Sequence, residues 1–349
     1  MISLTTGGQR YTGWLTASVY RSLDAFAHSF EFTAVDRWAE QESPRPIRLG
    51  DPCTIFQDDV LLITGYVDEL LWEVGPRGVT LRVSGRSKTA DLVDCAAIHK
   101  TGQWINAKPL RIMQDLAEPF GIGIEQDQAL ASDTTRVRRF DLEDGESAFD
   151  AIEKLARLRG WLPTTTAIGT LRLTQVGNTK PVSLRADSTI RRTITQNSSD
   201  RFSIYRVRTQ TARWDAETSP RQAALSKIQV QDSTVPRYRP TVLYPEHGAT
   251  VAELEAYATW MRNTRIADSE RITYEMPGTL ASNGEIWDPG QLVNVRDDQI
   301  GINTTLVIAS TKLQVDANGE TTELLLTRPE AYTQKPIPEA DLIRKLRKR

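Results

Sequence analysis

The feature that most constrains the fold is a pattern of turns and strands that occurs twice. Residues 49–86 and residues 287–328 each begin with a turn containing Asp, Pro and Gly, and continue into a short apolar strand that ends in Asp-Asp. Each segment then has a longer strand, a tight turn and a closing strand that ends in arginine. Few residues are identical, but the order of turn types is the same. We therefore predict an internal duplication of about forty residues.

The first quarter of the chain has the pattern of antiparallel β structure. Residues 30–35 alternate between polar and apolar, which is typical of a half-buried strand. Residues 54–57, 60–73 and 79–84 follow as strands that tight turns connect. Antiparallel strands in this order favour a barrel or a curled sheet.

The middle of the chain changes character. Residues 109–120 and 147–159 each place apolar residues on one face at helical spacing. Two short strands are predicted over 161–165 and 170–175, with a turn between them. These elements indicate a small α/β unit inserted between the two copies of the repeat.

β structure then returns, together with one long helix. Strands are predicted over 190–195, 202–213 and 271–276, and Thr250 begins a helix to residue 267, with a glutamate three residues later in a capping-box spacing. The fold class is therefore mainly β with an α+β insert. Four segments result: a first β-barrel over 1–88, a small α/β insert over 89–185, a second β-barrel over 186–330 that includes the helix 250–267, and a basic C-terminal tail over 331–349.

The sequence shows no clear catalytic or metal-binding pattern. Adjacent residues on a strand point to opposite faces, so Asp58 and Asp59 are poorly placed to share a proton or a metal, and Asp is a favoured turn residue. None of His28, His99 and His247 has the spacing of a metal ligand. No dinucleotide, phosphate-binding or nucleophile-elbow motif is present. We predict no catalytic residues, no cofactor and no metal.

The overall composition does not indicate a protein that binds nucleic acid, although the C-terminal tail is basic. The formal net charge is −2, and the two cysteines match no zinc or disulfide framework, so free thiols are expected. No stretch approaches about 18 continuous apolar residues, so no membrane insertion is predicted, and synthesis in the cytoplasm is expected. The tail is basic and could bind a partner or nucleic acid, or could be a frayed, solvated end; its candidate residues are Arg344, Lys345, Arg347, Lys348 and Arg349.

Several motifs together resemble one known family. The sequence is similar to the Mu-like phage tail protein P family in the segments 11–14, 18–22, 30–32, 50–51, 65–68, 83–87 and 145–161. The resemblance implies a baseplate hub of a phage tail, related to the hubs of T-even phages and to the N-terminal part of VgrG proteins. Such hubs are trimers with two tube-like antiparallel β-barrels per subunit.

The repeat gives this resemblance a physical rationale. Two barrels per chain, in three chains, would let a trimer match a sixfold tail tube on one side and a threefold spike on the other. The implied partners are a second and third copy of this chain, a tail tube or distal tail protein, a central spike protein, other baseplate proteins, and DNA only in transit. The expected location is the virion tail baseplate. Candidate acidic residues at the channel or its rim are Asp58, Asp59, Asp68, Glu69, Asp297 and Asp298.

Two other functions are kept open at this point. One is a tail-associated enzyme that degrades peptidoglycan, which would need a carboxylate pair across a groove or a metal site. The other is a DNA-binding module that acts through the basic tail, which would give salt-sensitive DNA binding.

Overall fold

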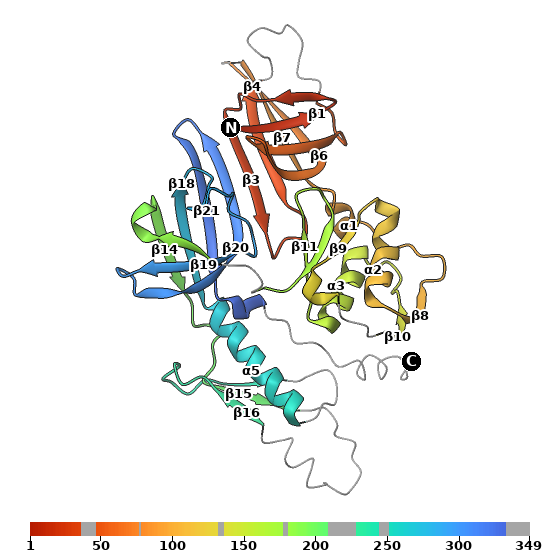
Figure 1. Ribbon diagram of the computed structural model, residues 1–349, viewed down its shortest axis with the longest axis vertical. Coiled ribbons are helices and arrows are strands. Elements are labelled where there is room, and N and C mark those ends of the chain that lie inside the picture. The colour runs from red at the N-terminus through yellow and green to blue at the C-terminus, as the bar shows by residue number, and fades with distance from the viewer. Residues whose placement is uncertain are drawn as a thin grey trace, which may run out of the picture.

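The structure is a computed structural model, and it describes residues 1–35, 47–76, 78–131, 136–176, 181–208, 228–243 and 251–332. These residues are mainly β, as predicted, and they form one large and mostly antiparallel sheet and three small sheets. Figure 1 shows the large sheet in two halves, one red to orange and one blue to green, with an α/β unit beside the first half and helix α5 below the second.

The first half of the large sheet is called the first module. Its strands are β1 (Ile2–Thr6), β2 (Gln9–Tyr11), β3 (Thr16–Ser22), β4 (Ser29–Val35), β5 (Pro52–Gln57), β6 (Val60–Gly75) and β7 (Gly78–Ser87). They lie in the order β3-β4-β7-β6-β5-β1-β2. Alternate residues point inward, so Phe30 and Phe32 pack in one core with Ile55, Leu81 and Val83.

The second half of the sheet is called the second module. Its strands are β13 (Val182–Arg185), β14 (Arg191–Gln196), β18 (Glu270–Pro277), β19 (Leu292–Asp297), β20 (Ile302–Asp316) and β21 (Gly319–Thr327). They lie in the order β14-β18-β21-β20, and β19 joins β20 to β13. A separate core lies beneath them, centred on Tyr274, Trp287 and Leu324. The strand β13, which was expected in the insert, pairs with this module.

Six strands of each module correspond in both chain order and neighbour order. The sequence β3-β4-β7-β6-β5-β1 in the first module matches β14-β18-β21-β20-β19-β13 in the second. Within its own module each long strand has two partners, because its first part pairs with the preceding strand and its second part with the following strand. One difference is that β1 is antiparallel to β5, whereas β13 is parallel to β19.

The expected pair of closed barrels is not what the strand pairing shows. Within the described residues no pairing joins the two ends of either module. Instead the second part of β20 pairs with β3, which connects the modules into one continuous sheet. Each module is therefore a curled sheet. In the first module, β3 pairs with β20 of the second module and is therefore not available to close the first.

The α/β unit has its own core. It contains α1 (Ala90–Asp94), β8 (Gln103–Ala107), α2 (Pro109–Ala117), β9 (Ile124–Gln126), β10 (Val137–Asp141), α3 (Ala148–Arg159), β11 (Leu162–Thr165) and β12 (Leu171–Thr174), with the short 3-10 turns η1 (Glu118–Phe120) and η2 (Gln128–Leu130). Helices α2 and α3 were predicted from their apolar spacing, and their buried Ile112, Leu116, Ile152 and Leu155 form the centre of the core.

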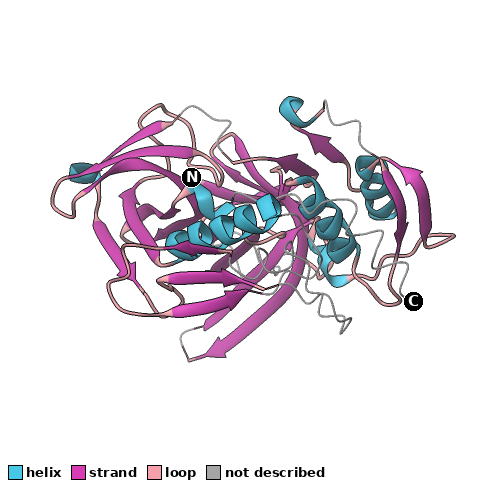
Figure 2. Ribbon diagram, turned by 90° about the horizontal axis from the view of Figure 1, so that it is seen from below, coloured by secondary structure: helices cyan, strands magenta, loops and turns pink. Residues whose placement is uncertain are grey.

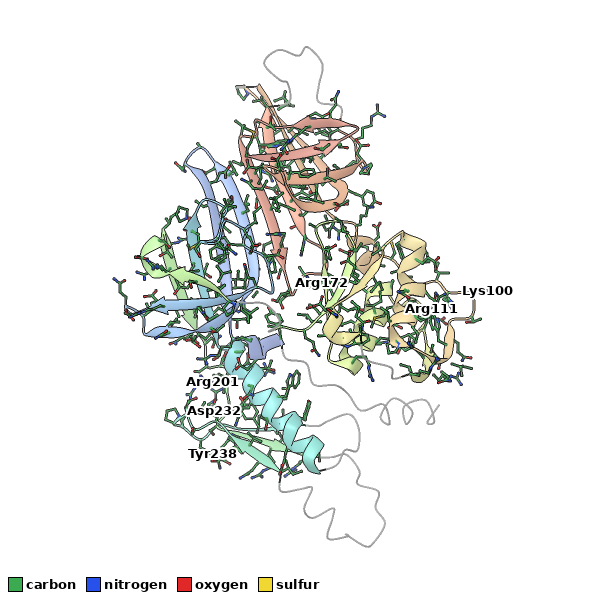
Figure 3. All side chains as sticks on the ribbon, in the orientation of Figure 1. Lys100, Arg111, Arg172, Arg201, Asp232 and Tyr238 are labelled. Carbon is green, nitrogen blue, oxygen red and sulfur yellow. The ribbon has the colours of Figure 1, made fainter. Side chains whose placement is uncertain are left out.

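A second helical unit lies at the other end of the molecule. It contains β15 (Ile204–Val207), β16 (Gln229–Gln231), β17 (Pro240–Leu243), α5 (Val251–Asp268) and η4 (Pro329–Tyr332), whereas the short turn η3 (Ala186–Ser188) contacts β19 of the second module. Figure 2, seen from below, shows α5 in front of the strands. In Figure 3, Arg201 and Asp232 lie together beside α5, and their ion pair measures 2.7 Å. No helix in the described part of the chain is long and apolar enough to cross a membrane.

Candidate functional site

The candidate site is the polar face of the large sheet, on the side opposite the two cores. Strand alternation creates it: where Phe30 and Phe32 point into the first core, Glu31 between them points outward. We call this surface the outer face. It extends over both modules because β20 and β3 connect them without a break.

Several charges on the outer face occur as pairs of opposite sign. Arg86 lies 2.9 Å from Asp68, and Arg191 lies 3.2 Å from Glu275. Arg86 also holds Asp94 at 2.6 Å, and hydrogen bonds to Asp94 and then to Asp68 raise its pKa above the ordinary value. The face therefore carries alternating charges rather than a field of one sign.

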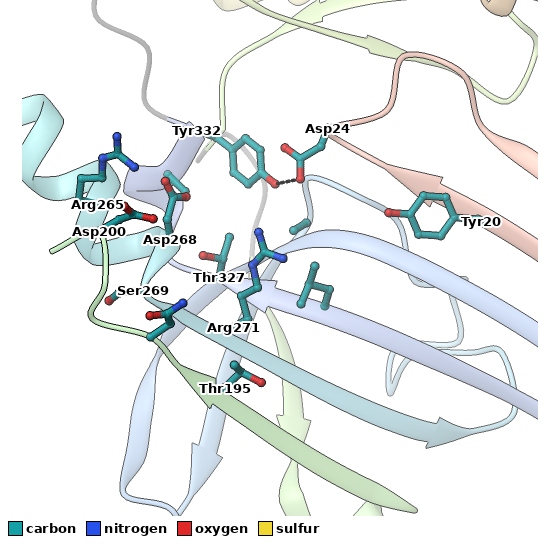
Figure 4. Close-up of a pocket in the computed structure, with 14 residues that line it drawn as sticks. Tyr20, Asp24, Thr195, Asp200, Arg265, Asp268, Ser269, Arg271, Thr327 and Tyr332 are labelled. Atoms are coloured by element: carbon teal, nitrogen blue, oxygen red, sulfur yellow. Dashed lines mark hydrogen bonds between the residues drawn. The ribbon is translucent and has the colours of Figure 1, made fainter.

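A hollow of about 740 Å³ lies on this face where the modules meet the second helical unit (Figure 4). Tyr20 of β3 and Thr195 of β14 line it. Tyr332 donates a hydrogen bond of 2.9 Å to Asp24, and burial together with that carboxylate raises the pKa of Tyr332 above its ordinary value. The hollow is polar. In the described part of the chain no group of three potential metal ligands comes together.

Asp58 and Asp59 form the turn between β5 and β6, in agreement with the turn interpretation. Asp58 has a φ of 52°, a left-handed conformation that Asp tolerates better than most residues. Its carboxylate accepts a hydrogen bond of 2.5 Å from the amino group of Met1, which lowers its pKa. Glu320 of the second module also lies 3.3 Å from that amino group. This turn therefore contributes to the contact between the two modules.

Asp68 and Glu69 lie at the β-bulge of β6, where the register with β7 shifts between Val67 and Glu69. A bulge redirects side chains, and both acids are exposed on the outer face. They line a second hollow of about 620 Å³ on the outer face of the first module, and none of the other four candidate acids lines it.

Asp297 departs from the expectation of a rim charge. It is 1% exposed and accepts hydrogen bonds from Arg192 at 2.7 Å and from Tyr274 at 3.2 Å. The strand register explains this, because Asp297 matches the equally buried Gln57 at the end of β5. Asp298 occupies the place of Asp58 and is exposed. The six candidate acids therefore form no single cluster, and the charge of Asp297 is compensated inside the second module.

The contact between the modules is tight. Lys312, Leu313 and Gln314 of β20 face Tyr20, Val19 and Ser18 of β3 in antiparallel register. Leu313 is 5% exposed and belongs to the core of the first module. Arg21 is also buried, and it donates hydrogen bonds to the carbonyl of Trp287 and, at 2.7 Å, to the carboxylate of Asp288.

Besides β2 and β13, which each pair with one strand only, two longer strands of the large sheet have a bare edge among the described residues. The second part of β6 pairs only with β7, and β14 pairs only with β18, among the described residues. The sequence reasoning did not identify these edges. A signal was present: Leu70, Leu71 and Trp72 put apolar side chains on both faces of one strand, whereas a strand with one solvated face alternates. The basic residues 344–349 lie outside the described residues.

Models of three protein families match successive parts of the chain. Residues 1–87 match the Mu phage baseplate assembly protein GpP-like N-terminal domain, residues 89–175 match the second domain of baseplate hub protein gp44-like, and residues 250–335 match the fourth domain of Mu phage baseplate assembly protein GpP. The chain belongs to the Mu GpP/gp44-like baseplate hub family.

Individual relatives support this membership over nearly the whole length. The chain is 28% identical to baseplate hub protein gp44 of Escherichia phage Mu over 338 residues, which is 95% of this chain and 88% of the relative. A tail protein of 43 kDa from prophage MuSo2 of Shewanella oneidensis is 29% identical, with a TM-score of 0.84 and coverage of 96% and 99% of the two chains.

More distant likeness concerns the fold alone. The E. coli c3393 protein, described as a type VI secretion component similar in structure to the T4 tail proteins gp27 and gp5, has a TM-score of 0.56 at 12% identity. The alignment covers 96% of this chain and 80% of that one.

Membership of the family bears on one of the functions that the sequence left open, the tail-associated enzyme. A GpP/gp44-like baseplate hub protein is a structural component of the phage tail and baseplate, not an enzyme. The interpretation as a peptidoglycan-degrading enzyme is therefore wrong.

Proposed function

We propose that this hub protein is a trimeric adapter, which joins a sixfold tail tube to a threefold central spike and surrounds the channel through which DNA leaves the virion. The two modules are proposed to be copies of one duplicated unit, each contributing a segment of a tube wall.

The observation that carries this proposal is the matched strand order of the two modules within one chain. Because each chain contains two such units, three chains contain six. A trimer thus presents six similar units to a sixfold ring and three identical chains to a threefold spike. The difference in symmetry between a sixfold tube and a threefold spike is then bridged by one kind of subunit.

The contact between the modules has the form that rings require. It joins one edge of the second module to the opposite edge of the first, through β20 and β3, and so is heterologous. Heterologous contacts that repeat with a closing rotation give closed rings. Each chain still has one free edge of each kind, on β6 and on β14.

The outer face is proposed to line the channel. Its paired charges, such as Arg86 with Asp68 and Arg191 with Glu275, give DNA no continuous basic surface to bind. Asp68 and Glu69 add negative charge on that surface. The turns that carry Asp58, Asp59 and Asp298 hold matching places in the modules, so a trimer would display them at six positions of a rim.

Contacts with other baseplate proteins are assigned to the parts outside the ring. The α/β unit and helix α5 project from the large sheet (Figure 1), and are proposed to face the spike and the surrounding baseplate. The basic residues of the tail, Arg344 to Arg349, are proposed to bind a neighbouring baseplate protein.

Sedimentation velocity over a series of concentrations tests the trimer. The expected species has three times the chain mass of 39.1 kDa. A protein that stays monomeric at the highest concentration, with and without purified spike protein, would overturn the adapter function.

Deleting residues 335–349 tests the role of the tail. The shortened chain should still form trimers, and it should lose affinity for the neighbouring baseplate protein. Salt-sensitive DNA binding that disappears on the same deletion would instead support the DNA-binding module.

A further inference from the structure

We propose that β6 of one subunit pairs with β14 of the next, in the register that β20 and β3 use inside each chain. The partner is a second copy of this protein, and the inference rests on the trimer proposed above. Trp72 is assigned as the residue that enters the second core of the neighbouring subunit, beside its Ile194.

The two strands have the bare edges that such a contact needs. Residues 69–75 of β6 have β7 on one side and, among the described residues, no strand on the other. Their apolar side chains are exposed, with Leu71 at 39%, Trp72 at 51% and Val74 at 81%. Bare apolar edges attract other strands, and proteins normally cover them.

The matching strand of the second module is covered. Counted from the bulges, Trp72 of β6 corresponds to Leu313 of β20, and Val74 corresponds to Val315. Leu313 is buried in the core of the first module, and Val315 packs against that core. The two strands have apolar residues at the same places, but only β20 has a partner within the chain.

The register follows from one row of paired residues across each module. A row is a set of facing residues on neighbouring strands, and each row starts at the residue just before the bulge. In the first module the row is Val67–Gly85–Phe30–Val19. In the second module it is Ile308–Leu326–Ile272–Ile194. Val19 therefore corresponds to Ile194. Since Leu313 faces Val19 inside the chain, Trp72 faces Ile194 of the neighbour. By the same count Leu71 faces Thr195, and Glu73 faces Thr193.

The chemistry of the two edges is complementary in this register. Ile194 already packs against the second core, so the indole of Trp72 extends that core as Leu313 extends the first. On the outer face Glu73 lies diagonal to Arg191, within reach of a long side chain. Both contacts are antiparallel and use the same pair of edges, so three of them close a ring with three intramolecular junctions between them.

Cysteine pairs test the register directly. Facing residues of antiparallel strands have Cα atoms about 4.5–5.5 Å apart, which suits a disulfide. Leu71→Cys with Thr195→Cys in one chain should give covalent dimers and trimers after oxidation with diamide. The background carries Cys95→Ser because Cys95 is exposed, whereas burial raises the pKa of the Cys53 thiol to about 12 and keeps it unreactive.

The chain provides a matched control. Lys312 and Tyr20 face each other at the contact between the modules, as Leu71 and Thr195 are proposed to do between subunits. Lys312→Cys with Tyr20→Cys should therefore form a disulfide within one chain, and the protein should remain a monomer on a denaturing gel. Leu71→Cys with Ile194→Cys points the two thiols to opposite faces and should remain monomeric on a denaturing gel.

A second arm measures the role of Trp72. Trp72→Glu should raise the concentration for half assembly about tenfold or more, as expected for a central aromatic anchor. Ile105→Glu, at an exposed apolar position on β8, should leave it unchanged.

The outcomes separate this inference from the adapter function. Covalent trimers with the Leu71 and Thr195 pair alone support the register. Trimers in sedimentation that never crosslink there, while the control pair closes, overturn the register and leave the adapter standing. A chain that forms no trimer overturns the adapter.

Discussion

The second parts of β20 and β6 hold matching places in their modules, but one is buried and the other is bare. From Ser310 to Val315, β20 is buried or half-buried, because β3 pairs with its free side. From Asp68 onward β6 is exposed, although it carries Leu71, Trp72 and Val74. The difference teaches that the burial of a strand here depends on which edge of the next module is available, and not on its own sequence alone.

The largest effect should come from truncating the two matched residues in turn. Leu313→Ala removes a buried side chain and should lower the free energy of unfolding by about 2–5 kcal/mol. Trp72→Ala, in protein diluted to the monomer, should cost less than about 1 kcal/mol because the indole is already half exposed. Urea denaturation measures both. Equal costs in the monomer would mean that the two strands do not differ as described.

The next largest effect concerns the hydrogen bonds of the buried Arg21 at the contact between the modules. Arg21→Met removes two hydrogen bonds from the guanidinium to Trp287 and Asp288, and should lower the free energy of unfolding by about 1.5–3 kcal/mol. Gln196 holds the corresponding place on β14, so Gln196→Met is the matched control and should stay within about 0.5 kcal/mol. A large loss from the control would show that the free edge is already engaged in the monomer.

A pH dependence should distinguish the modules. Burial, and then the charge of Arg21, lower the pKa of His28 from 6.5 to about 3, whereas the matching Glu270 accepts hydrogen bonds from Gln196 and Arg328. The unfolded chain takes up the His28 proton first, so this contribution is fully present above pH 6.5 and decreases as pH falls. The loss should reach about 2 kcal/mol at pH 5.

Urea midpoints at pH 7 and pH 5 measure this loss. His28→Gln should remove about that much of the pH dependence, whereas His99→Gln, in the α/β unit, should retain it. If the free energy of unfolding of His28→Gln changed with pH as much as that of the unaltered protein, the pH dependence would come from other groups.

The smallest effect concerns the two turns. A hydrogen bond from the amino group of Met1 lowers the pKa of Asp58, so its contribution is present above the ordinary carboxyl pKa and is lost as pH falls through the lowered value. Asp58→Asn should cost less than about 1 kcal/mol at pH 7, because the pair is exposed. Asp298→Asn should cost even less, because the one ion pair of Asp298 with a described residue is a long contact of 3.7 Å to Arg296. Thermal unfolding at pH 7 compares the two, and the reverse order would reject the described contacts.

The sequence allowed most strands of the two modules, the two long insert helices and the repeated order of turns to be predicted, because these depend on local periodicity. The burial of Asp297 could not be predicted, since it depends on a pairing register that places it opposite Arg192 and Tyr274. The connection of the modules into one sheet was missed for the same reason: β20 and β3 are almost three hundred residues apart in the chain. The strands β8 and β10 were also missed, because their pairing is not visible in any single segment.

The most direct test of the central claim is an end-on view of the assembled protein by electron cryomicroscopy. The account predicts a closed ring of three chains, with six similar strand-rich lobes around one channel and β6 of each chain beside β14 of the next. A ring with three lobes, or a trimer held together by the α/β units with β6 still bare, would contradict it.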